Sequence, residues 1–196
     1  MPRLAYRSPL SGTAAPLGIV GITGRGVRLI EKPLPAMIEL RGDPDDERFI
    51  NGTAAALGFA PPIIPCTSAA AHGWRVLWSR PDGWLIVGPQ GESEAKLAAL
   101  KSALAGIHHV AVDVSHRAVA LELSGDNARR VLAKGCPLDL HPRAFKAGDC
   151  ARTILTGQPV LIHALSDAPA YDLYIEQGLA RALWLWFKEA TREYVA

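Results

Sequence analysis

The chain has 196 residues, of which 49% are apolar and 20% are charged, and its formal net charge is +2. A chain of this length buries an adequate hydrophobic core without a metal or a disulfide, and so mild and scattered a charge argues against a nucleic-acid partner. Three cysteines without a C-x-x-C pair favour free thiols, and no apolar run has the length of a signal sequence or a membrane span, so we expect a cytoplasmic protein without membrane contact.

The first 35 residues are rich in glycine, proline and small side chains, and the first part of this stretch is predicted to be an extended arm. Four glycines lie at irregular spacing in and after this arm: Gly18, Gly21, Gly24 and Gly26. Their spacing matches neither the dinucleotide-binding nor the P-loop motif, so we interpret them as turn residues. A short strand is expected at residues 27–31.

A strand at residues 36–42 precedes a predicted helix that has Asp43 as its N-cap and Pro44 as its first residue, and that ends at Gly58. The start of this helix is strongly acidic, with Asp43, Asp45, Asp46 and Glu47. Such a cluster has the composition of a metal site, but the positive end of the helix dipole is sufficient to explain it.

Residues 74–78 and 84–87 are predicted to form a β-hairpin, because the turn sequence Arg80-Pro81-Asp82-Gly83 lies between them. Three tryptophans belong to this hairpin: Trp74, Trp78 and Trp84. They are either a stacking platform for a flat ligand or, more commonly for paired aromatics, part of a core. A helix over residues 92–105 follows, and Gly106 marks its end.

In the second half of the chain, apolar and polar residues alternate over residues 119–123, which predicts a half-buried strand. A capped helix is expected between Asn127 and Gly135. Two further strands are predicted at residues 159–164 and 171–175.

The last predicted helix runs from about Gly178 to Tyr194 and is apolar around much of its circumference. Such a helix lies either in the centre of a core or beneath a partner protein. We therefore name a candidate partner interface on this helix, formed by Trp184, Leu185 and Phe187.

The chain shows no recognisable catalytic motif. Asp113, Ser115 and His116 include the residue types of a hydrolytic triad, but on a strand His116 would point away from the other two. Three further residues are possible soft metal ligands without a familiar zinc spacing: Cys136, His141 and Cys150. We expect no catalytic, cofactor-binding or metal-binding residue in this chain.

An ordered series of short motifs covers most of the chain: Leu40-Arg41-Gly42-Asp43-Pro44, Pro81-Asp82-x-Trp84-Leu85, Asp113-x-Ser115, Leu121-x-Leu123-x-Gly125, Gly135-Cys136-x-Leu138-Asp139-Leu140-His141-Pro142 and Leu183-Trp184-x-Trp186-Phe187. In this order the motifs resemble the gamma subunits of heterotetrameric sarcosine oxidase. The part from Asp113 to Gly125 is also similar, more loosely, to the aminomethyltransferase superfamily of folate-binding proteins.

The resemblance implies an α+β fold in two parts. Residues 34–105 would form a small α/β plait, which the order of the predicted elements also suits. Residues 106–196 would form an aminomethyltransferase-like, folate-binding-type α+β domain with antiparallel or mixed sheets, completed by the N-terminal arm, residues 1–33.

The resemblance also implies a function, that of a non-catalytic structural subunit of a sarcosine oxidase complex. Such a complex demethylates sarcosine to glycine, with hydrogen peroxide and methylenetetrahydrofolate as further products. The alpha, beta and delta subunits would be the partners, and FAD, FMN, NAD and tetrahydrofolate would bind to other subunits.

Two alternatives remain open from the sequence. One is a stand-alone folate-binding or one-carbon-transfer protein, in which Asp113 or Asp139 would supply the carboxylate for the pterin ring. The other is a homodimer that associates through the tryptophan-rich last helix.

Overall fold

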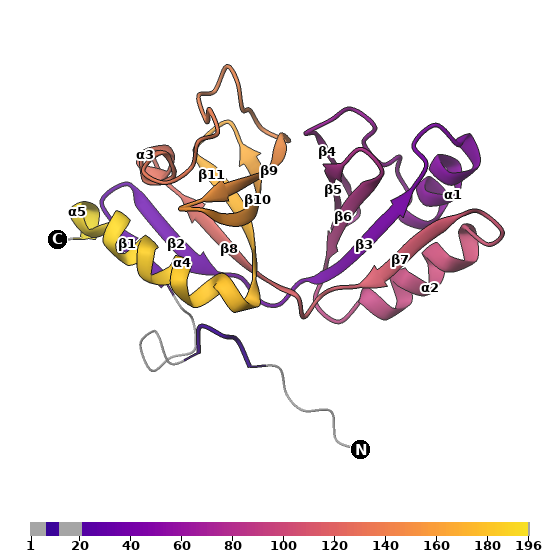
Figure 1. Ribbon diagram of the computed structural model, residues 1–196, viewed down its shortest axis with the longest axis horizontal. Helices are drawn as coiled ribbons and strands as arrows, with labels where there is room; N and C mark the ends of the chain where they lie inside the picture. Colours follow the sequence, from indigo (N-terminus) through magenta and orange to yellow (C-terminus); the bar gives the residue numbers. More distant parts are fainter. Residues whose placement is uncertain (1–6, 12–20, 196) are drawn as a thin grey trace.

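The computed structural model describes residues 7–11 and 21–195 (Figure 1). Residues 1–6 and 12–20 of the predicted N-terminal arm, Gly18 included, lie outside these residues. The described chain folds into two antiparallel sheets that carry helices on their outer faces, which confirms the predicted α+β class. Within the described residues, no helix has the length and apolarity needed to cross a bilayer.

The first sheet has six strands: β1 (Gly21–Gly24), β2 (Val27–Glu31), β8 (Ala118–Ser124), β9 (Cys150–Leu155), β10 (Gln158–Ser166) and β11 (Ala170–Glu176). The second has five: β3 (Ala36–Gly42), β4 (Ser68–Ala71), β5 (Trp74–Arg80), β6 (Gly83–Gly88) and β7 (His109–Asp113). The helices are α1 (Glu47–Leu57), α2 (Ser93–Ala103), α3 (Ala128–Ala133), α4 (Gln177–Ala190) and α5 (Arg192–Val195). The strand orders are β1-β2-β8-β11-β10-β9 and β4-β5-β6-β3-β7.

The five-stranded sheet contains the predicted hairpin, formed by β5 and β6. Helices α1 and α2 cover one face of this sheet (Figure 1), and Trp74 and Trp84 lie in the core beneath them. The two side chains are only 4% and 0% exposed, so they pack the core and present no platform to a ligand. Strand β7 follows residue 106 and pairs with β3 in the same sheet.

The start of α1 differs from the prediction. Its N-cap is Asp46, which accepts a hydrogen bond from the backbone N–H of Arg48 at 2.9 Å. Asp43 instead accepts from the N–H of Asp45 at 2.9 Å, in a turn that comes before the helix. The chain therefore enters the helix three residues later than expected. The predicted end at Gly58 is confirmed, because this residue has φ 84° and closes the last turn.

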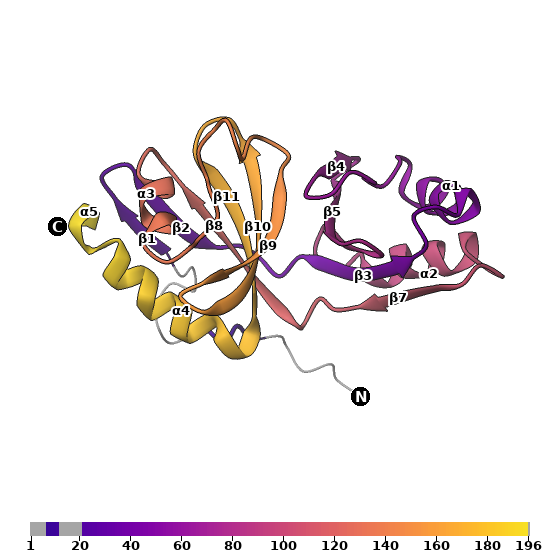
Figure 2. The same ribbon diagram turned by 45° about the horizontal axis from the view of Figure 1, so that its top comes forward.

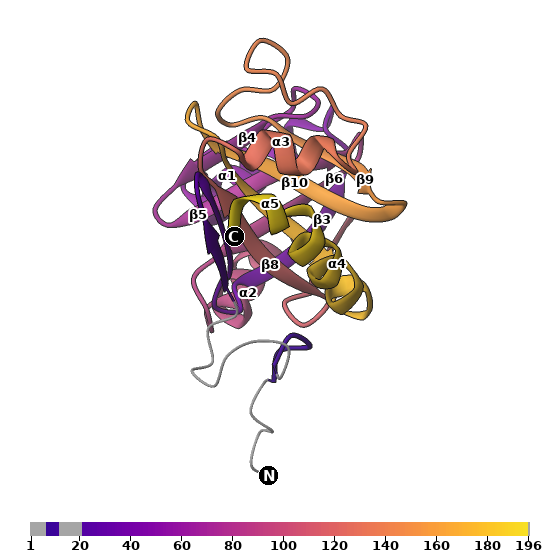
Figure 3. The same cartoon turned by 90° about the vertical axis from the view of Figure 1, so that its left-hand side faces the viewer.

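The six-stranded sheet packs its outer face against α3 and α4, as the end view shows (Figure 3). Trp184 and Phe187 of α4, expected at a partner surface, are only 2% and 0% exposed and belong to this core. That expectation is wrong for these two residues, because the buried side of α4 is wide enough to include Trp184 as well as the predicted stripe. Leu185 is 52% exposed.

The inner faces of the two sheets share a third apolar cluster. Met37, Leu77 and Leu85 come from the five-stranded sheet, and Leu161 and Tyr174 come from the six-stranded one. The chain crosses between the sheets at residues 32–35 and 114–117, at the base of the molecule in Figure 1 and near its centre in Figure 2. Charged side chains lie on both sides of this shared cluster.

Candidate functional site

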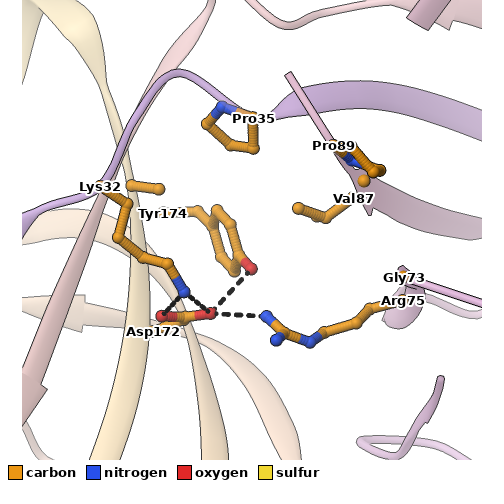
Figure 4. Close-up of a pocket in the computed structure, with 10 residues that line it drawn as sticks. Lys32, Pro35, Gly73, Arg75, Val87, Pro89, Asp172 and Tyr174 are labelled. Carbon is orange, nitrogen blue, oxygen red and sulfur yellow. Dashed lines mark hydrogen bonds and ion pairs between the residues drawn. The ribbon is translucent and has the colours of Figure 1, made fainter. Parts of the chain in front are cut away.

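Asp172 is the one carboxylate of the described chain that is fully buried, with a side chain 1% exposed. Its neighbours Tyr171 and Leu173 point into the outer core, so the alternation along β11 turns Asp172 toward the other sheet. There it accepts hydrogen bonds from Lys32 Nζ at 2.8 and 3.0 Å and from Arg75 Nη1 at 2.9 Å (Figure 4).

These contacts join three segments that are distant in the sequence. Lys32 follows β2, Arg75 belongs to β5 of the five-stranded sheet, and Asp172 is part of the six-stranded sheet. The Tyr174 hydroxyl lies 3.4 Å from the same carboxylate, and burial raises the pKa of this phenol. The phenol therefore keeps its proton and donates a hydrogen bond to Asp172. We call this group of four residues the Asp172 clamp.

His163 extends the clamp along β10, where it pairs in register with Asp172. Burial lowers the pKa of His163 to about 4, although the charge of Asp172 opposes this effect. The ring is therefore neutral at pH 7. Its Nε2 atom lies 3.0 Å from the Ser68 hydroxyl on β4, a second polar link between the sheets.

A cavity of about 190 Å³ adjoins the clamp, and Pro35, Val87 and Pro89 form its apolar wall (Figure 4). The polar side chains that line this cavity are those of the clamp itself, and the hydroxyl among them, that of Tyr174, keeps its proton because burial raises its pKa. The arrangement is therefore suited to fixing the two sheets against each other and offers no evident nucleophile.

The triad-type residues Asp113, Ser115 and His116 all line a second cavity, of about 680 Å³. The Ser115 hydroxyl donates to Asp113 at 2.6 Å and accepts from the Met37 N–H at 2.9 Å. Burial raises the pKa of Asp113, but its hydrogen bonds, chiefly those with Ser115 and Ser93, lower it more. Ser115 thus ties the crossing segment to β3, and its hydroxyl donates to the Asp113 carboxylate. The strand ends at Asp113, which is why the predicted strand alternation does not extend to His116.

The possible soft ligands do not form a metal site. The Cys150 thiol donates to the carbonyls of Thr67 and Trp78 at 3.2 and 3.3 Å, and burial raises its pKa to about 12. Cys136 instead lies 3.9 Å from the hydroxyl of Thr153. Among the residues that the structure describes, no group of three or more histidine, cysteine or acidic side chains is placed to hold a metal ion.

The two candidate carboxylates for a pterin ring, Asp113 and Asp139, lie in different parts of the structure. Asp139 lies in the exposed loop after α3, where it accepts from the backbone N–H of His141 at 2.9 Å. Asp113 is bound to Ser115 at the end of β7. Each carboxylate is thus engaged in local structure.

No motif in the sequence indicates the Asp172 clamp. Its one signal is an aspartate inside an otherwise apolar strand, because a buried carboxylate requires a cationic partner. Neither Lys32 nor Arg75 lies near Asp172 in the sequence, so nothing local indicates which residues supply the positive charge.

The fold resembles those of two solved structures. It is shared with the aminomethyltransferase T of the glycine cleavage system from Bartonella henselae, with a TM-score of 0.65 and 17% identity, covering 85% of this chain and 46% of that one. A chain of the heterotetrameric sarcosine oxidase from Corynebacterium sp. U-96 matches more fully, with a TM-score of 0.86, 29% identity and 97% coverage of both chains.

Sequence comparisons define the family. The chain is 36% identical over 168 residues to sarcosine oxidase subunit gamma from Arthrobacter sp., covering 85% of this chain and 81% of that protein. It is 35% identical over 169 residues to the same subunit from Corynebacterium sp. (strain P-1), covering 85% of this chain and 81% of that protein. The pattern of the sarcosine oxidase gamma subunit family matches residues 41–193. The chain belongs to this family.

Proposed function

We propose that this chain is a non-catalytic structural subunit of a heterotetrameric sarcosine oxidase. The observation that carries this proposal is the match over 97% of both chains to a chain of such an enzyme. The alpha, beta and delta subunits are its partners in this proposal, and FAD, FMN, NAD and tetrahydrofolate bind to those subunits. The complex oxidises sarcosine to glycine.

The geometry of the polar groups supports a structural role. The Asp172 clamp and the His163–Ser68 contact both connect one sheet to the other. Each contact joins a polar side chain of one sheet to a polar side chain of the other, which favours one fixed arrangement of the two sheets. A rigid element of this kind is suited to holding larger subunits in register.

We propose that the chain has two structural units, one for each sheet. Because β7 pairs with β3 in the five-stranded sheet, the division suits the strand pairing better at residues 114–117 than at residue 106. Strands β1 and β2 belong to the six-stranded sheet, which supports assigning the N-terminal segment to that unit. Leu185, exposed on α4, remains a proposed contact with a partner.

The proposal places the complex in the cytoplasm. All three cysteines are free, and reducing compartments preserve free thiols. Oxidation of sarcosine, a small metabolite, is also suited to that compartment.

Co-expression with the other three subunits tests the proposal. We expect this chain to elute in one gel-filtration peak with the three partners and with flavin absorbance. A chain that elutes alone, while its partners assemble without it, would contradict the subunit role. The comparisons favour this role over a stand-alone folate-binding protein, and titration calorimetry with tetrahydrofolate separates the two, because only the latter would give a binding isotherm with the isolated chain.

A further inference from the structure

Three arginines gather at one margin of the cluster that the two sheets share, on the side of β3, β8 and β9. Glu39 of β3 accepts hydrogen bonds from Arg80 Nη2 at 3.2 Å and from Arg117 Nη1 at 2.5 Å. Arg152 of β9 lies close enough to both arginines to experience their charge. Among the described residues, Arg152 itself forms neither a hydrogen bond nor an ion pair.

This arrangement has more positive than negative charge. Glu39 is already bound by two guanidinium groups, and the further carboxylate that acts on Arg152 is that of Glu176. Arg152 is exposed overall, but its partial desolvation, together with the like charges of Arg80 and Arg117, lowers its pKa. Three cations therefore face two carboxylates, and the free chain tolerates an unfavourable concentration of like charge.

Exposed apolar side chains flank the arginines. Val112 of β7 pairs in register with Glu39, so its side chain lies on the same face of the sheet, and it is 48% exposed. Ile154 lies two residues beyond Arg152 on the same face of β9 and is also 48% exposed. We call this set the arginine face: Arg80, Arg117, Arg152, Val112 and Ile154.

The cavity at the arginine face is too small for a cofactor. It measures about 30 Å³ and is lined by Arg117, Arg152 and Glu176 together with apolar residues of the shared cluster. Ligand pockets usually hold several hundred Å³. The tip of one carboxylate side chain fits a space of this size.

We propose that the arginine face docks an acidic segment of a partner subunit, with a carboxylate of that segment bound by Arg152 and Arg117. Arginine and apolar side chains together are typical of interface centres, and complementary charge selects the partner. The carboxylate would neutralise the excess cation while Val112 and Ile154 pack against apolar residues beside it. This proposal rests on the subunit role proposed above.

Competitive assembly tests the docking. The other three subunits are co-expressed with equal amounts of tagged wild-type chain and a differently tagged variant, and the ratio of the two in the purified complex is measured. We expect Arg152→Glu to be incorporated at least about tenfold less than the wild type, since a buried interfacial charge would be reversed. Arg152→Gln should show a smaller loss. Lys101→Glu, the same charge reversal at an exposed site on α2, should be incorporated equally.

Thermal melting of the isolated chains separates docking from folding. Arg152→Glu removes repulsion from Arg80 and Arg117, so its Tm should not fall below that of the wild type. If Arg152→Glu melts at a lower temperature than the wild type, the docking is judged from the incorporation of Arg152→Gln instead.

The outcomes separate the two proposals. Equal incorporation of wild type and folded Arg152→Glu would overturn the docking and leave the subunit role intact. Failure of the wild-type chain to enter the complex would overturn both.

Discussion

Asp172 of β11 accepts a hydrogen bond from Arg75 of β5 at 2.9 Å, and this bond connects the six-stranded sheet to the five-stranded one. The carboxylate is 1% exposed, whereas the Arg75 side chain is 37% exposed. Arg75 and Lys32 thus replace the water that the carboxylate loses on folding, while the two cations themselves remain in contact with solvent.

Asp172→Ala should destabilise the chain strongly. It leaves two cations facing each other without their shared acid. Breaking a buried ion pair costs about 3–5 kcal/mol, and the partial exposure of both cations reduces the expected loss to about 2–3 kcal/mol. Urea denaturation measures this change, with Asp167→Ala in an exposed turn as the control. Equal midpoints for the two variants would show that the clamp adds nothing to stability.

The stability of the folded chain should decrease as the pH falls from about 6.5 to about 4. Burial lowers the pKa of His163 from 6.5 to about 4, so in this window the unfolded chain binds a proton that the folded chain does not. The contribution of neutral His163 to the free energy of unfolding is fully present above pH 6.5 and amounts to about 3 kcal/mol or less. His163→Gln should flatten this part of the profile of unfolding free energy against pH. His108→Gln, at an exposed histidine, should leave it unchanged, and an identical slope in both variants would contradict the assignment.

One thiol should react rapidly in the native chain. Cys66 is exposed, whereas Cys136 and Cys150 are buried, and burial raises the pKa of Cys150 to about 12. An aromatic disulfide reagent at pH 8 should therefore label one cysteine quickly and the other two only after unfolding. Cys66→Ser should abolish the rapid phase. A rapid phase that persists in this variant would place a second thiol within reach of solvent.

Gly125→Ala should be much more damaging than Gly91→Ala. Both glycines have positive φ, 104° and 82°, so both substitutions introduce backbone strain of about 1–2 kcal/mol. A Cβ at Gly125 would also lie 2.5 Å from the carbonyl oxygen of Gly26, whereas at Gly91 nothing lies within 4 Å. The added clash should bring the loss for Gly125→Ala to about 3 kcal/mol or more. Chemical denaturation of both variants checks this difference, and equal losses would mean that the contact between the two turns relaxes freely.

Local sequence signals were sufficient for much of the fold. The turn sequence between β5 and β6 correctly predicted a hairpin, and the alternation of apolar and polar residues correctly predicted strand β8. Each signal depends only on residues that are close in the chain. The first turn of α1 was predicted less well. Two aspartates compete there for the capping position, and the geometry of the preceding turn decides in favour of Asp46.

The position of α4 depended on contacts that the sequence does not display. Helical periodicity excluded Trp184 from the buried stripe, but in the folded chain this side chain also belongs to the core between α4 and the six-stranded sheet. The Asp172 clamp was beyond sequence analysis for a similar reason. Its charges meet only after β2, β5 and β11 have been assembled into two separate sheets.

The central claim is that this chain is a structural subunit of a flavin-containing sarcosine oxidase. The most direct measurement is affinity isolation of the tagged chain from its source organism, followed by a visible absorption spectrum of the eluate. We predict that larger partner chains co-purify, that the eluate shows flavin absorption bands, and that it releases hydrogen peroxide when sarcosine is added. A colourless eluate that contains this chain alone would contradict the claim.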